Sequence, residues 1–111
     1  MKNPSNPHEF VKELHSIKPT YKMLCITKHG CPACVGLKQE IPKLERKYNG
    51  KISFINLDVD NFMDLVRQNN IDAVPTSIMV QTSGDNIVWS SKKLIGYDDN
   101  EFEKVISSKI N

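Results

Sequence analysis

Apolar positions along the chain follow two spacings, which separate predicted helices from predicted strands. In residues 8–17 and 34–48, apolar side chains recur every three or four positions, which is the spacing of one helix face. Residues 21–27 are instead a nearly continuous apolar run, typical of a strand covered on both sides. Pro42 lies within the second helical segment, and we expect it to kink that helix.

The rest of the chain predicts three more strands and two more helices. The strands are expected at residues 52–59, 74–80 and 87–95, which are rich in β-forming residues and bounded by turn residues. Asp60-Asn61 is expected to cap a short helix after the first of these strands. Asp98-Asp99 is expected to start a last amphipathic helix.

The predicted order is therefore helix, strand, helix, strand, helix, strand, strand, helix. Alternation in the first half implies parallel strands joined by a right-handed crossover. A loop at residues 82–86 joins the last two strands as a hairpin. This order predicts an α/β fold in which helices cover a small mixed sheet.

Length and charge limit the class of protein further. At 111 residues the chain suits one domain, residues 1–111, with the polar residues 1–7 as a mobile arm. The formal charge of +2 is too small to predict binding to nucleic acid or to a membrane. Three cysteines without a recognisable signal peptide predict a reducing, cytoplasmic setting rather than a disulfide scaffold.

Candidate chemistry lies between the first predicted strand and the long helix, in residues 28–34. Cys31 and Cys34 are three positions apart, so one helical turn brings both sulfurs to the same face, close enough for a disulfide. The helix N-terminus offers free N–H groups and a partial positive charge, which favour the thiolate of Cys31. Pro32 suits the first helical turn, where its missing N–H is not needed.

A C-x-x-C pair is also half of many zinc sites, which need two further ligands. Cys25 and His29 are the nearby candidates for these ligands. Cys25, however, lies inside a predicted strand with no loop that could bend it around a metal. We therefore interpret the dithiol as a redox pair, with neither a metal nor another cofactor.

Further landmarks accompany the dithiol. Residues 48–52 read Tyr-Asn-Gly-Lys-Ile, residues 57–60 read Leu-Asp-Val-Asp, residues 71–76 read Ile-Asp-Ala-Val-Pro-Thr, and Gly96 follows the last predicted strand. In this order and at this spacing, the landmarks resemble the thioredoxin family over residues 21–110. The resemblance implies the thioredoxin fold, a central mixed sheet flanked by helices, with a cis peptide bond before Pro75.

The resemblance also implies a thiol–disulfide oxidoreductase that reduces protein disulfides, serving electron transport and cell redox homeostasis. Cys31 would attack the substrate disulfide, and Cys34 would resolve the intermediate and form a redox-active disulfide with Cys31. The groups at Val74-Pro75-Thr76 and at Gly96 would bind the substrate chain. The implied partners are disulfide-bearing proteins and a reductase, either thioredoxin reductase or the glutathione system, and the protein is expected to be a monomer.

The motif departs from the family's usual Trp-Cys-Gly-Pro-Cys. Gly30 stands in place of the tryptophan, and the residues between the cysteines are Pro32 and Ala33, so the proline has moved by one position. The place of the family's buried aspartate falls on Cys25, and that of its lysine partner falls on Asn56. The acid–base relay typical of thioredoxins is therefore missing or replaced.

Two side chains near the dithiol have two interpretations each. Cys25 is either a small buried hydrophobe or a regulatory or resolving thiol. His29 either stabilises the Cys31 thiolate as an imidazolium or is a solvated loop residue.

Two other functions are compatible with the same residues. Cys31-Pro32 and the run Gly96-Tyr97-Asp98-Asp99 also suit a glutaredoxin-like, glutathione-dependent enzyme. A groove beside Pro75 that only holds a partner would make the chain a non-catalytic, thioredoxin-like binding subunit. The intact dithiol argues against that second alternative.

Overall fold

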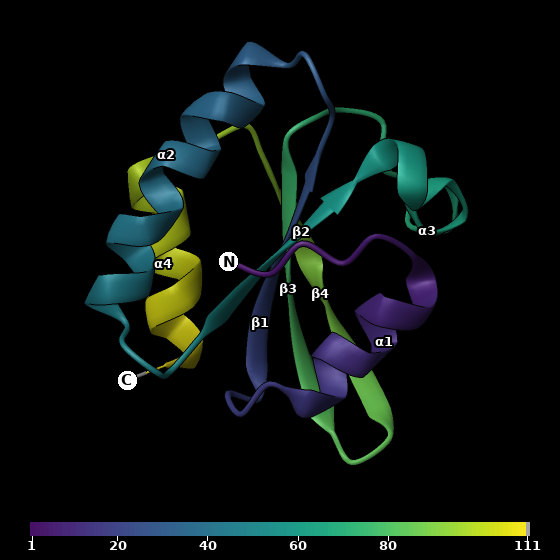
Figure 1. The fold of residues 1–111 in the computed structure, drawn as a ribbon. Coiled ribbons are helices and arrows are strands. Elements are labelled where there is room, and N and C mark those ends of the chain that lie inside the picture. The colour runs from purple at the N-terminus through teal and green to yellow at the C-terminus, as the bar shows by residue number, and fades with distance from the viewer. Residues whose placement is uncertain (111) are drawn as a thin grey trace.

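The computed structural model describes residues 1–110, and its elements follow the predicted order (Figure 1). The strands are β1 (Tyr21–Thr27), β2 (Ser53–Asp58), β3 (Thr76–Ser83) and β4 (Asn86–Ile95). The helices are α1 (Pro7–Ser16), α2 (Pro32–Lys47), α3 (Met63–Gln68) and α4 (Asp99–Lys109), and a 3₁₀ turn, η1 (Val59–Asn61), precedes α3. Within this described part of the chain, no helix has the length and apolar character needed to span a membrane.

The four strands form one mixed sheet in the order β2-β1-β3-β4. β1 runs parallel to β2 and antiparallel to β3, and β3 runs antiparallel to β4. Figure 1 shows α2 and α4 on one face of the sheet and α1 and α3 on the other. The prediction of a small mixed sheet between helices is therefore confirmed.

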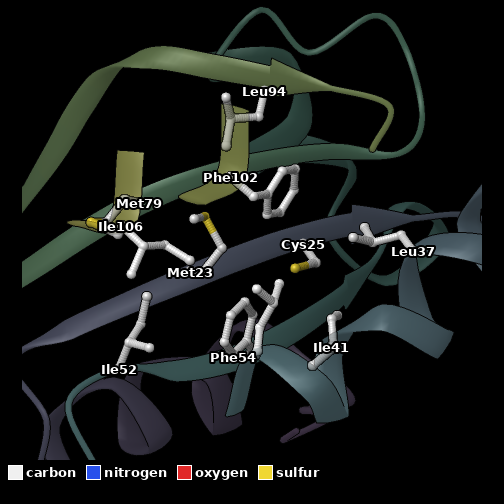
Figure 2. Packing of buried hydrophobic residues seen from close by; sticks show 11 residues of the cluster. Met23, Cys25, Leu37, Ile41, Ile52, Phe54, Met79, Leu94, Phe102 and Ile106 are labelled. Atoms are coloured by element: carbon white, nitrogen blue, oxygen red, sulfur yellow. The ribbon is translucent and has the colours of Figure 1, made fainter. Parts of the chain in front are cut away.

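Each face of the sheet has its own hydrophobic core, because side chains alternate along a strand. On β1, Met23 and Cys25 face α2 and α4, whereas Leu24 and Ile26 face the side of α1. Figure 2 shows the first of these cores, in which Cys25 lies among side chains from β2, α2 and α4. β1 is thus covered on both faces, as its continuous apolar run predicted.

The structure places part of the N-terminal segment, residues 1–7, against the sheet. Lys2 pairs with Ile55 as a short parallel bridge on the free edge of β2, with hydrogen bonds to the backbone of Phe54 and Asn56 at 3.1 and 2.8 Å. Pro4 is buried, and Pro7 already begins α1. The reason is that an edge strand presents unpaired backbone groups, which a polar segment can satisfy as well as an apolar one.

The predicted cap of the third helix is wrong. Asp60 and Asn61 lie in η1 itself, and the carboxylate of Asp58 caps this turn by accepting the N–H of Asp60 at 2.8 Å. α3 begins only at Met63 and has no side-chain cap. The cap predicted for the last helix is confirmed, since Asp98 accepts the N–H of Glu101 at 3.0 Å.

Candidate active site

The loop after β1 places Cys31 at the N-cap of α2. β1 ends at Thr27, and the chain turns at Gly30, whose φ of +80° lies in the left-handed region that favours glycine. Cys31 keeps an extended backbone, and Pro32 begins the helix. The Sγ of Cys31 accepts the N–H of Cys34 at 3.2 Å, so the sulfur occupies the position of a capping oxygen.

The two cysteines differ in exposure. Cys31 is partly exposed, whereas Cys34, one turn further, is only 2% exposed on the side of α2 that faces the sheet. Both thiols are free. This arrangement leaves one sulfur accessible to a partner and keeps the second behind it.

The pKa values of the two thiols shift in opposite directions. The pKa of Cys31 is lowered, chiefly by its hydrogen bond with the Cys34 side chain and further by the backbone N–H groups of Cys34 and Ala33. The pKa of Cys34 is raised, first by burial and then by its hydrogen bond with Cys31. Cys31 is therefore the thiol that ionises first.

These opposite shifts predict the pH dependence of alkylation. Thiolate is the reactive form, so the rate at Cys31 rises as pH increases through its pKa. We expect the midpoint for Cys31 to lie below the ordinary thiol value of about 8.5, and Cys34 to react only above it. The reduced protein is treated briefly with iodoacetamide at a series of pH values, and mass spectrometry gives the alkylation rates of Cys31 and Cys34. N-acetylcysteine treated in the same way is the reference. A midpoint for Cys31 at or above that of the reference contradicts the proposed stabilisation of its thiolate.

The loop before β3 lies against the nucleophile. The Sγ of Cys31 is 3.9 Å from the carbonyl oxygen of Val74, and the Val74–Pro75 peptide bond is cis, as the resemblance implied. Hydrogen bonds hold the end of this loop next to β3: the Gly96 N–H donates to the Pro75 carbonyl at 2.8 Å, and the Thr76 hydroxyl donates to the Ala73 carbonyl at 2.6 Å. The structure thus brings the predicted substrate-binding residues beside Cys31.

His29 lies in the loop between β1 and α2, two residues before Cys31. Its side chain is exposed, and it is not among the groups in the described residues that shift the pKa of Cys31. The positive charge that does lower this pKa belongs to Lys38, one turn beyond Cys34 on α2, and it lowers those of Cys34 and Cys25 as well. Sequence reasoning missed Lys38, although its spacing of four from Cys34 was a usable signal.

The third thiol is buried beneath α2. Cys25 is 0% exposed and stands in register with Asn56 on β2 and Ser77 on β3. Burial raises the pKa of Cys25 to about 12; the Ser77 hydroxyl opposes this shift, although it makes no regular hydrogen bond. The side-chain oxygen of Asn56 accepts a hydrogen bond from the hydroxyl of Thr27 at 2.7 Å.

No three side chains of His, Cys, Asp or Glu in residues 1–110 are grouped so that they could share a metal ion.

Cys25 is expected to resist alkylation in the folded protein. It is fully buried, and its raised pKa leaves almost no thiolate at neutral pH. Brief iodoacetamide treatment followed by mass spectrometry should label Cys31 and leave Cys25 unmodified until denaturant is added. Labelling of both at similar rates in the native state would revive the redox interpretation of Cys25.

The comparisons with known proteins agree with this geometry. The sequence model of the thioredoxin family matches residues 4–108. Thioredoxin H2 of Arabidopsis thaliana is 30% identical over 99 residues, which cover 86% of this chain and 70% of that protein. Thioredoxin 2 of Plasmodium berghei (strain Anka) is 32% identical over 66 residues, which cover 60% of this chain but only 42% of that protein.

Solved structures show the same fold at lower identity. The germline-specific thioredoxin Deadhead of Drosophila melanogaster superposes with a TM-score of 0.83 at 17% identity, covering 99% of this chain and all of that one (100%). The thioredoxin of Trichomonas vaginalis gives a TM-score of 0.80 at 18% identity, covering 97% and 96% of the two chains. With the family match over nearly the whole chain, these findings show that the chain belongs to the thioredoxin family, a family of thiol–disulfide oxidoreductases.

Proposed function

We propose that the chain reduces disulfide bonds in proteins, with Cys31 as the nucleophile and Cys34 as the resolving thiol. The observation that carries this proposal is the difference between the two sulfurs: Cys31 is accessible and has a lowered pKa, whereas Cys34 is buried and has a raised one. A nucleophile must reach its substrate as a thiolate, and a resolving thiol must act only after the first step.

In the first step the Cys31 thiolate attacks one sulfur of the substrate disulfide. A mixed disulfide forms, and the second substrate sulfur leaves as a thiolate that takes a proton from water. In the second step Cys34 gives its proton to water and attacks the Cys31 sulfur. The remaining substrate sulfur leaves as a thiolate that takes a proton from water, so the substrate gains two electrons and two protons and Cys31–Cys34 becomes a disulfide.

The substrate chain would lie along Val74-Pro75-Thr76 and past Gly96. The backbone before β3 is held beside the nucleophile by the hydrogen bond from Gly96 to Pro75. Backbone groups bind any extended peptide irrespective of its side chains, which suits an enzyme that acts on many proteins.

Turnover requires an external reductant, because each cycle leaves the dithiol oxidised. We propose thioredoxin reductase as this partner rather than the glutathione system, because the family match is to thioredoxin. In the run 96–99, which suggested glutathione binding, both aspartates already make hydrogen bonds within the chain. Asp98 caps α4, and Asp99 accepts a hydrogen bond from the hydroxyl of Tyr97 at 2.6 Å. We propose a monomer acting in a reducing compartment such as the cytoplasm, where such a dithiol can be regenerated.

Two assays test the proposal. Insulin reduction with dithiothreitol as the electron source separates a reductase from a protein that only binds partners. The same assay with NADPH and thioredoxin reductase, compared with glutathione, glutathione reductase and NADPH, identifies the electron donor. We expect insulin reduction with dithiothreitol and with NADPH and thioredoxin reductase. Activity with the glutathione system alone would favour the glutaredoxin-like alternative. No activity with any electron donor would leave only the binding function.

A further inference from the structure

A groove separates α1 from the segment that runs from Asp60 to Gln68. It has a volume of about 630 Å³, compared with about 240 Å³ for the hollow beside Val74. Its walls include two buried aromatic side chains, Phe10 from α1 and Phe62 from the turn before α3. Their rings meet edge to face at 82° with centroids 5.9 Å apart, which gives the groove a well-packed wall.

Two large apolar side chains beside these aromatics are exposed to solvent. Val11 on α1 is 47% exposed, and Met63 at the start of α3 is 54% exposed. They come from different elements and line the same groove, so they form one apolar surface rather than isolated exposures. Continuous apolar surface of this kind marks a site of contact with another molecule more often than single exposed residues do.

The charged groups of the groove are mainly acidic. Asp60 and Asp64 both line it, and Arg67 is the single cation among the described residues of its lining. Arg67 pairs with Asp64 at 3.2 Å, whereas none of the ion pairs within residues 1–110 uses Asp60. An apolar groove with an uncompensated carboxylate complements an apolar side chain next to a lysine or arginine.

Consecutive residues of η1 line the hollow near the dithiol and the groove. Val59, the first residue of η1, lines the hollow that Lys28 and Val74 also line, and this hollow adjoins Cys31 through Val74. Asp60 and Asn61, the next two residues, line the groove. A chain whose disulfide lies at Cys31 can therefore pass over η1 and reach the groove.

We propose that the groove between α1 and α3 binds a second segment of the protein substrate, one with a large apolar side chain next to a lysine or arginine. This inference rests on the proposed function, because it treats the protein whose disulfide reacts at Cys31 as the occupant. Binding of such a segment in the groove raises the rate at which Cys31 attacks protein disulfides. Small disulfides lack the segment, so their rate does not depend on the groove. The groove thus makes the enzyme selective among proteins without touching the reacting atoms.

Synthetic peptides test the groove directly. Each peptide carries one cysteine as a mixed disulfide with thionitrobenzoate, a Gly-Ser linker of graded length, and a terminal segment that is either Leu-Lys-Lys or Ser-Glu-Glu. Mixing with prereduced protein releases thionitrobenzoate when Cys31 attacks the peptide sulfur, and its absorbance gives the second-order rate constant. We expect the Leu-Lys-Lys peptide to react about tenfold faster at the best linker length, a factor that partial burial of one leucine supplies.

The variants localise this advantage. Val11→Ser combined with Met63→Ser should remove most of it, and Asp60→Asn should reduce it. Val88→Ser and Asp85→Asn are matched controls at exposed positions of β4 and of the hairpin loop, and both should retain it. Equal rates for both peptides at every linker length, or an equal loss in the control variants, would overturn the proposal.

Two further measurements distinguish substrate binding in the groove from a general loss of thiol reactivity and from self-association. Ellman's disulfide, which has no peptide segment, should react equally fast with all variants; if the unaltered protein fails to reduce it, the proposed function fails rather than the groove. Sedimentation of the unaltered protein and the double variant should give the same mass. A loss of mass in the double variant would assign the groove to contact between two copies of the chain and overturn the proposal.

Discussion

A Cys34→Ser variant is expected to accumulate mixed disulfides with protein substrates, whereas Cys31→Ser should fall to the background rate of insulin reduction. The first change leaves the accessible sulfur of Cys31 in place and removes only the buried thiol that resolves the intermediate. The second change removes the sulfur whose pKa is lowered. Non-reducing gels of each variant after incubation with a cell extract show the mixed-disulfide adducts, and dithiothreitol should reduce these disulfides and release the partner proteins.

Cys25→Ser is the matched control for this experiment. It removes a thiol as well, but one that is fully buried in the core, so the trapped fraction should stay at the level of the unaltered protein. Adducts mainly on Cys31→Ser would reverse the assignment of the two sulfurs. Equal trapping by both variants would mean that burial of Cys34 does not limit its access to substrates.

Most of the fold follows from local spacing. β1 has the boundaries that the continuous apolar run predicted, residues 21–27, and the cap of α4 is Asp98, as predicted. These features depend on residues close in sequence, so a single segment contains all the information. The pairing of Lys2 with β2 could not be predicted in this way, because the free edge exists only after the sheet has formed.

The same distinction applies to the candidate site. The relation between Cys31 and Cys34 follows from one helical turn and needs no tertiary information. The position of the Pro75 loop beside Cys31 depends on strand order, and it was predicted only through the resemblance to thioredoxins. Ser77 beside Cys25 was missed, because its position next to Cys25 depends on the register of β1 against β3.

Phe102→Ala is expected to lower the free energy of unfolding by about 3–5 kcal/mol, the usual cost of truncating a buried phenylalanine. Phe102 is 1% exposed on α4 and lies in the core that contains Cys25 (Figure 2). Its ring also contacts that of Tyr97, with centroids 4.9 Å apart, in the segment that follows Gly96. A domain of this size is stable by about 5–15 kcal/mol, so this loss is a large share of the total.

Urea unfolding followed by circular dichroism measures the effect, with Val88→Ala as the control. Val88 is 56% exposed, so its truncation should change stability by less than about 0.5 kcal/mol. The Phe102→Ala protein should still form mixed disulfides through Cys31 at low temperature, because the hydrogen bonds that position Cys31 and the Pro75 loop do not involve Phe102. If the urea midpoint of Phe102→Ala were as close to that of the unaltered protein as the midpoint of Val88→Ala is, the packing of α4 against the sheet would be contradicted.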